Sequence, residues 1–181
     1  MAAEVKQTRT ERLAAFDAVV AEYEARLLRY AARVVNDHNA AQDVVQDTFI
    51  RLFRKWDEPL TPSPKLSSWL YRVAHNRAVD HIRRTSRRQD LHTRHAEEQD
   101  CYSAPDRGEG FRVSDGAARA VGALKTLSLR EQQLVILKVY EEKSYQEISD
   151  ITGLKTGNVG YILHHAMRKM AAQLRRVGDH D

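Results

Sequence analysis

The sequence predicts an all-α protein built as two small helical domains joined by a flexible linker. Apolar residues recur at helical spacings through most of the chain, whereas the alternation typical of strands is nearly absent. Only four prolines and eight glycines interrupt 181 residues, which leaves room for long helices. Residues 89–115 contain Pro105, Gly108, Gly110 and few apolar side chains, so we interpret them as a mostly unstructured linker.

Composition restricts the class of protein. With 42% hydrophobic residues and a mean hydropathy of −0.60, the chain can bury one or two small cores and remain soluble. No apolar run approaches the roughly 18 residues that a membrane-spanning helix needs, and residues 1–10 are polar, so we predict neither membrane insertion nor export. Cys101 is the single cysteine, which excludes an internal disulfide and fits a reducing cytoplasm.

Three amphipathic helices are expected in the first half of the chain. They should span Thr10–Asn36, Ala40–Trp56 and Leu66–Arg84. A segment that contains Pro59, Pro62 and Pro64 separates the last two and predicts a rigid loop. The second helix has a polar outer face interrupted by the apolar Ile50, so this face is either simply solvated or docks on a partner.

Positive charge concentrates on the third helix. Seven basic residues and the single acid Asp80 lie between Lys65 and Arg88. Such density is typical of surfaces that contact nucleic-acid phosphates, because each neutralised phosphate releases counterions. Trp69 and Tyr71 at the start of this helix are candidate stacking platforms for unpaired bases, although Trp69 also fits a place in the core.

Two helices are expected early in the second half, over Gly116–Leu127 and Leu129–Tyr140. Ser128 and Glu131 form a capping box that opens the second of them. Its inward residues should be Leu134, Val135, Leu137 and Val139.

The segment Ser144–Met170 then predicts a helix-turn-helix. Ser144 and Glu147 form another capping box, and Gly153 stands where a sharp turn requires a positive φ. A second helix follows, with an apolar stripe of Val159, Ile162, Leu163, Ala166 and Met170. A polar outer face on that helix is typical of an element that enters the DNA major groove. The alternative is an ordinary helical hairpin with a solvated face.

The chain offers little support for an enzyme or a metal site. His92, His95 and Cys101 lie within ten residues but do not have the spacing of a zinc site. Histidines elsewhere, such as His75 and His81, are not accompanied by a recognisable nucleophile–base pair or a phosphate-binding loop. We therefore predict a protein without cofactor, metal or catalytic residues.

Two stretches resemble bacterial sigma-70-family factors. Residues 43–53 and 68–84 look like conserved regions 2.2 to 2.4, and Leu127–Met170 resembles region 4 with its serine-tyrosine-x-glutamate-isoleucine opening. Two such domains with nothing resembling region 3 between them are the layout of the extracytoplasmic-function group. The implied organisation is a flexible tail over residues 1–11, region 2 over 12–88, a linker over 89–115, region 4 over 116–176 and a C-terminal tail over 177–181.

The resemblance implies three functional surfaces. Docking on the clamp coiled coil of the largest RNA polymerase subunit would use Asp43, Gln46, Asp47, Ile50 and Arg51. Recognition and melting of the −10 promoter element would use Lys65, Ser67, Ser68, Trp69, Tyr71, Arg72, Asn76, Arg77, Arg83 and Arg84. Recognition of the −35 element would use Lys155, Thr156, Asn158, Tyr161, His164, His165 and Arg168. The flap of the second-largest polymerase subunit and an anti-sigma factor are further partners that the resemblance implies.

The recognition helix departs from the family pattern. Where relatives commonly read glycine-threonine-valine-lysine-serine-arginine, this chain has Gly157-Asn158-Val159-Gly160-Tyr161-Ile162. Two basic positions are lost, so we expect a weaker phosphate contribution and an unusual or loosely read −35 sequence. A dimeric helix-turn-helix repressor is the competing hypothesis, but it assigns no role to the first 88 residues.

Overall fold

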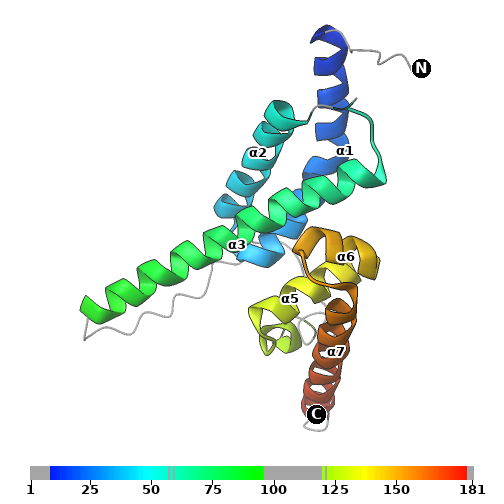
Figure 1. Cartoon of the computed structure of the whole chain (residues 1–181). Coiled ribbons are helices and arrows are strands. Elements are labelled where there is room, and N and C mark those ends of the chain that lie inside the picture. The colour runs from blue at the N-terminus through cyan, green and yellow to red at the C-terminus, as the bar shows by residue number, and fades with distance from the viewer. Residues whose placement is uncertain (1–8, 57, 59, 96–119, 121, 179–181) are drawn as a thin grey trace. The chain divides into compact units, whose positions relative to one another are not determined.

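The computed structural model describes residues 9–56, 58, 60–95, 120 and 122–178. The regular secondary structure in these residues is helical, without a strand, and the all-α prediction is confirmed. The chain divides into two compact units, Met1–Glu98 and Gln99–Asp181 (Figure 1).

The first unit consists of helices α1 (Arg9–Val35), α2 (His38–Lys55) and α3 (Pro64–His95). Asp37 is the N-cap of α2, since its carboxylate accepts a hydrogen bond from the Ala40 amide at 2.8 Å. At the other end of α2, the guanidinium of Arg12 donates to the Trp56 carbonyl at 2.7 Å. A positive charge at a helix C-terminus is favourable, so this hydrogen bond from Arg12 stabilises the packing of α1 against the end of α2.

Helix α3 is longer at both ends than the sequence predicts. Pro64, predicted as loop, is its first residue, a position where the missing amide donor costs nothing. The hydroxyl of Ser63 accepts a hydrogen bond from the Leu66 amide at 3.1 Å and caps the helix. At the other end the helix continues through His95, because residues 85–95 contain neither proline nor glycine. The first part of the predicted linker is therefore helical, and the rest of it lies outside the described residues.

Aromatic side chains join α1 to α3 in the core of the first unit. Tyr30 is fully buried, and its hydroxyl lies 2.8 Å from Nδ1 of the buried His75. The Tyr30 ring also meets the ring of Tyr71 edge to face, with centroids 5.4 Å apart. Burial lowers the pKa of His75 from 6.5 to about 4, so this imidazole is neutral inside the fold at neutral pH.

The second unit contains α5 (Leu129–Val135), a π-helical turn (Ile136–Tyr140), α6 (Tyr145–Thr152) and α7 (Thr156–Gly178). Both predicted capping boxes, at Ser128 and at Ser144, are present. The π-helical turn buries Ile136 and leaves Val139 52% exposed, so the prediction that Val139 faces inward is wrong. The wider turn, closed by the Glu141 amide on the Ile136 carbonyl, shifts the residues that follow away from the regular helical face.

An ion pair links α5 to α7. Nζ of Lys169 lies 2.7 Å from the carboxylate of Glu131, whose side chain is nearly buried. The hydrogen bond from Lys169, together with those from Ser128, lowers the pKa of Glu131 to about 2. Glu131 thus serves twice, in the capping box of α5 and in the attachment of α7.

Candidate nucleic-acid and partner interfaces

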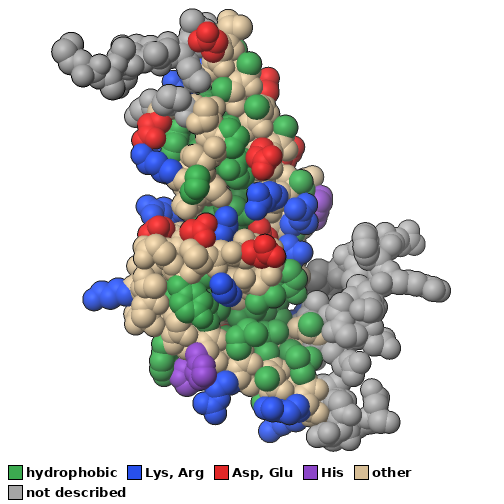
Figure 2. Space-filling view, turned by 90° about the vertical axis from the view of Figure 1, so that its right-hand side faces the viewer, with side chains coloured by type: hydrophobic (Ala, Val, Ile, Leu, Met, Phe, Trp, Pro, Cys, Tyr) green, Lys and Arg blue, Asp and Glu red, His purple; other side chains and the backbone are tan. Residues whose placement is uncertain are grey.

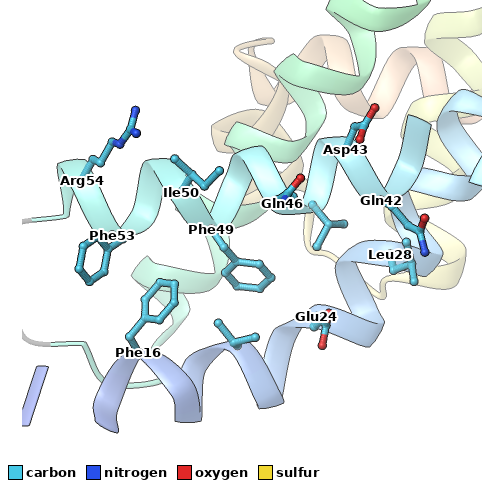
Figure 3. A pocket seen from close by; sticks show the side chains of 12 residues that line it. Phe16, Glu24, Leu28, Gln42, Asp43, Gln46, Phe49, Ile50, Phe53 and Arg54 are labelled. Carbon is cyan, nitrogen blue, oxygen red and sulfur yellow. The ribbon is translucent and has the colours of Figure 1, made fainter. Parts of the chain in front are cut away.

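Helix α2 presents an exposed face beside an apolar groove. Asp43, Gln46 and Ile50 are exposed at helical spacings of three and four, and Ile50 is 40% exposed although it is apolar. The adjacent groove between α1 and α2 has a volume of about 930 Å³. Phe16 of α1 points toward Phe49 and Phe53 of α2 inside it (Figure 3). An apolar groove beside a polar rim is a surface suited to a protein partner.

Helix α3 carries an exposed basic stripe. Arg72, Asn76, Arg83 and Arg87 are exposed at intervals of four, seven and four residues, which places them on one side of the helix. Lys65 is exposed at the start of the same side. This stripe runs along the side of α3 opposite to the core residues Leu70, Ala74 and Ala78. Its charge and exposure suit the backbone of a nucleic acid.

Some predicted −10 residues lie elsewhere. Tyr71 has no exposed surface and packs on Tyr30, so the prediction that it is a stacking platform is wrong in this structure. It lies one position after the buried Leu70, on the core side of α3. Ser67 is also buried, whereas Ser68 is half-buried. The ring of Trp69 meets that of the buried Trp56, with centroids 5.6 Å apart, and keeps part of its surface exposed.

Two predicted sets of residues meet where α2 and α3 pack. The guanidinium of Arg77, predicted to contact DNA, forms an ion pair with the carboxylate of Asp47, predicted to contact polymerase. The pair lies in a polar recess of about 160 Å³, which Arg84 also lines. Arg77 therefore faces α2 and not the exposed stripe, whereas Arg84 borders the same recess and is exposed.

The predicted helix-turn-helix is present in α6 and α7. Gly153 ends α6 in the left-handed conformation, with φ of 73°, and its amide donates to the Ser149 carbonyl at 2.9 Å. The hydroxyl of Ser149 donates to the Leu154 carbonyl at 2.6 Å and holds the turn. Val159 and Leu163 of α7 are buried against the unit. The angle between the two helices is thus fixed by the turn and by the core together.

The predicted DNA-facing side chains lie on the outer face of α7 and, for Lys155, directly before its first residue. Six of the seven are exposed: Lys155, Thr156, Asn158, Tyr161, His164 and Arg168. The seventh, His165, is half-buried and lies against the Tyr161 ring, with centroids 4.3 Å apart. Tyr161 itself is 67% exposed. On the face of the molecule that Figure 2 shows, hydrophobic side chains reach the surface among Lys and Arg side chains.

Sequence reasoning missed Tyr145 beside this face. A Cβ atom at Gly160 would lie 3.5 Å from the Tyr145 ring, which is ordinary van der Waals contact. Nζ of Lys138 lies 5.4 Å from the centroid of the same ring. Tyr145 therefore adds an aromatic edge, with a cation above it, next to the recognition helix. In the sequence, this place of Tyr145 is indicated by its position directly after the N-cap Ser144, at the first residue of α6.

Within the described residues, no cluster of three or more His, Cys, Asp or Glu side chains is arranged to hold a metal ion. The side chains of His92 and His95 and all of Cys101 lie outside the described part. None of the described helices is both long and apolar enough to span a membrane.

The helix-turn-helix of α6 and α7 and the basic stripe of α3 are features of a DNA-binding protein. Residues 19–88 match the family Sigma-70 region 2, and residues 118–170 match the family Sigma-70, region 4. The chain therefore belongs to the sigma-70 family, as an extracytoplasmic-function sigma factor, a class that serves promoter-specific transcription initiation.

Relatives match the chain over most of its length. It is 30% identical to the ECF RNA polymerase sigma factor SigL of Mycobacterium tuberculosis, covering 87% of both chains. It is 25% identical to the RNA polymerase sigma factor YlaC of Bacillus subtilis, over 86% of this chain and 89% of the relative. The fold resembles that of the sigma factor RpoE from Bartonella quintana, solved with the anti-sigma factor NepR. That comparison has a TM-score of 0.66, 20% identity and coverage of 88% and 96%.

Proposed function

We propose that this protein binds core RNA polymerase in the cytoplasm, directs it to promoters through their −35 and −10 elements and assists opening of the −10 region. It performs no catalysis of its own. One observation carries the proposal. Each unit has its own exposed face suited to DNA, on α3 in the first unit and on α7 in the second, and the two units match two different sigma regions.

In the first unit, the basic stripe of α3 contacts the −10 region. Arg72 and Arg83 bind backbone phosphates, and Asn76 between them supplies an amide that can donate and accept hydrogen bonds. Trp69, at the N-terminal end of the stripe, keeps part of its ring available for an unstacked base. Removing a base from the stack costs a few kcal/mol, which contacts of this kind must offset.

In the second unit, α7 lies in the major groove of the −35 element. Asn158 and Tyr161 reach base edges, while Lys155 and Arg168 contact phosphates at either end of the exposed face. Gly160 and Ile162 occupy the two positions where relatives commonly carry basic residues. The −35 contact of this protein therefore depends less on phosphate charge than on the fit of Tyr161 and its neighbour His165.

Protein partners bind the first and second units. The α2 face of Asp43, Gln46, Asp47, Ile50 and Arg51 docks on the clamp coiled coil of the largest polymerase subunit, and the second unit docks on the flap of the second-largest. Exposed Ile50 supplies the apolar anchor of the clamp contact. An anti-sigma factor is a further partner, supported by the fold likeness to RpoE, which was solved with NepR.

Core binding and promoter opening test this proposal together. Ile50→Glu should prevent the protein from co-migrating with core polymerase, because it places a charge in the apolar anchor. Arg72→Ala/Arg83→Ala should still bind core polymerase but lose permanganate-reactive thymines in the −10 region. A stable complex of Ile50→Glu with core, or unchanged reactivity in the double variant, would contradict the assigned surfaces.

A further inference from the structure

The ion pair of Asp47 with Arg77 joins a residue of the docking face to a residue of the DNA-facing helix. Asp47 lies on α2 at helical spacing from Asp43 and Ile50, so a partner that covers this face meets its carboxylate. Arg77 follows Asn76 directly on α3, at the border of the exposed basic stripe. The pair therefore lies between the two surfaces.

The ion pair directs Arg77 away from DNA. Its guanidinium reaches across to α2, into the recess lined by Ala40 and Val44. Arg72 and Arg83 project from the exposed side of α3. A guanidinium held on Asp47 has its charge neutralised and its donors engaged, so it adds little to phosphate binding.

The pair can open without disturbing the core. The side chain of Asp47 is 37% exposed and that of Arg77 is 27% exposed. Ion pairs this close to water contribute little to stability, and neither residue belongs to the buried cluster of Tyr30, Tyr71 and His75. A cationic group of a partner, placed on the α2 face, would compete with Arg77 for the Asp47 carboxylate.

We propose that Asp47 and Arg77 form a latch: the free protein holds Arg77 on α2, and a partner that engages Asp47 releases Arg77 to a DNA phosphate. The latch makes Asp47 a positioning residue and couples partner binding on α2 to DNA affinity on α3. This inference rests on the proposed function, because it takes α2 as the polymerase-facing helix and α3 as the DNA-facing one.

Salt dependence of DNA binding by the free, full-length protein tests the latch. Fluorescence anisotropy with a labelled forked promoter DNA would be recorded between 50 and 200 mM NaCl. Asp47→Asn should bind more tightly at low salt and steepen the log–log slope by about 0.7–0.9, as expected for one additional phosphate contact. Over that range its affinity should fall about threefold more than that of the wild type.

Three controls make the result specific. Asp47→Asn/Arg77→Gln should return to the wild-type slope, because the released guanidinium is absent. Asp17→Asn makes the same charge change at an exposed position of α1 outside the recess, and it should leave the slope unchanged. Circular dichroism melting should show that all variants are folded. No gain in Asp47→Asn, a gain that survives Arg77→Gln or an equal gain in Asp17→Asn would overturn the latch.

The same titration with saturating core polymerase separates the latch from the proposed function. In the holoenzyme the latch is already open, so wild type and Asp47→Asn should have equal slopes and Arg77→Gln a shallower one. A persistent difference between wild type and Asp47→Asn refutes coupling through the pair. Failure of the wild-type protein to bind core refutes the proposed function instead, and the free-protein titration then still decides whether Asp47 restrains Arg77.

Discussion

Acidification should destabilise the first unit through a single buried histidine. His75 is 6% exposed, its Nδ1 lies beside the Tyr30 hydroxyl, and burial lowers its pKa from 6.5 to about 4. In the unfolded chain this histidine takes up a proton near its ordinary pKa of about 6.5. Between those two values the unfolded state binds more protons, so the free energy of unfolding decreases as the pH falls from about 6.5 to about 4.

The size of the effect follows from the two pKa values. A difference between 6.5 and about 4 corresponds to about 3 kcal/mol, since one pKa unit is about 1.4 kcal/mol. The full loss is reached only below about pH 4, and at pH 5 the loss is about 2 kcal/mol relative to pH 8. This is a large share of the stability of a small domain.

Urea denaturation followed by tryptophan fluorescence measures this loss of unfolding free energy in the first unit. Trp56 and Trp69, the two tryptophans of the chain, both lie in the first unit and contact each other. His75→Gln removes the titrating ring, so its unfolding free energy should lose about 2 kcal/mol less than that of the wild type between pH 8 and 5. His81→Gln, at a half-buried position on the same helix, is the matched control and should behave like the wild type. Parallel pH profiles of wild type and His75→Gln would refute the reasoning.

Four further substitutions have definite expected outcomes. Gly160→Ala should stabilise the second unit by about 1 kcal/mol in thermal melts, because a Cβ fits beside Tyr145 and alanine favours the helix; Gly153→Ala, at φ of 73°, should destabilise it. Arg12→Met should cost the first unit about 1 kcal/mol in urea, since it removes the donor to the Trp56 carbonyl, and an unchanged midpoint would exclude that cap. Tyr161→Ala should weaken binding to −35 duplex about tenfold with an unchanged salt slope; a changed slope would indicate a phosphate role.

Local signals in the sequence predicted much of the fold. The capping boxes at Ser128 and Ser144 and the turn at Gly153 depend on residues three or four positions apart, and all three are confirmed. The exposure of the polar face of α7 can be predicted from helical periodicity, which also depends only on residues three or four positions apart. Features of this kind need no knowledge of the tertiary structure.

Contacts between distant residues could not be predicted in the same way. The sequence places Asp47 and Arg77 on different surfaces, because nothing within either helix indicates that their side chains meet where α2 packs on α3. It also places Tyr71 on the surface, because an aromatic ring beside arginines is typical of a base-stacking site. In the fold Tyr30 of α1 covers it. The π-helical turn at Ile136–Tyr140 likewise has no local sequence signal and leaves Val139 exposed.

Transcription in vitro tests the central claim most directly. Purified core RNA polymerase would be incubated with DNA from upstream of the protein's own coding sequence, with and without the protein. The account predicts a transcript with a defined start that forms only when the protein is present and that is lost in Arg72→Ala/Arg83→Ala. No transcript from any such fragment, together with specific duplex binding by the protein alone as a dimer, would contradict it and favour a helix-turn-helix repressor.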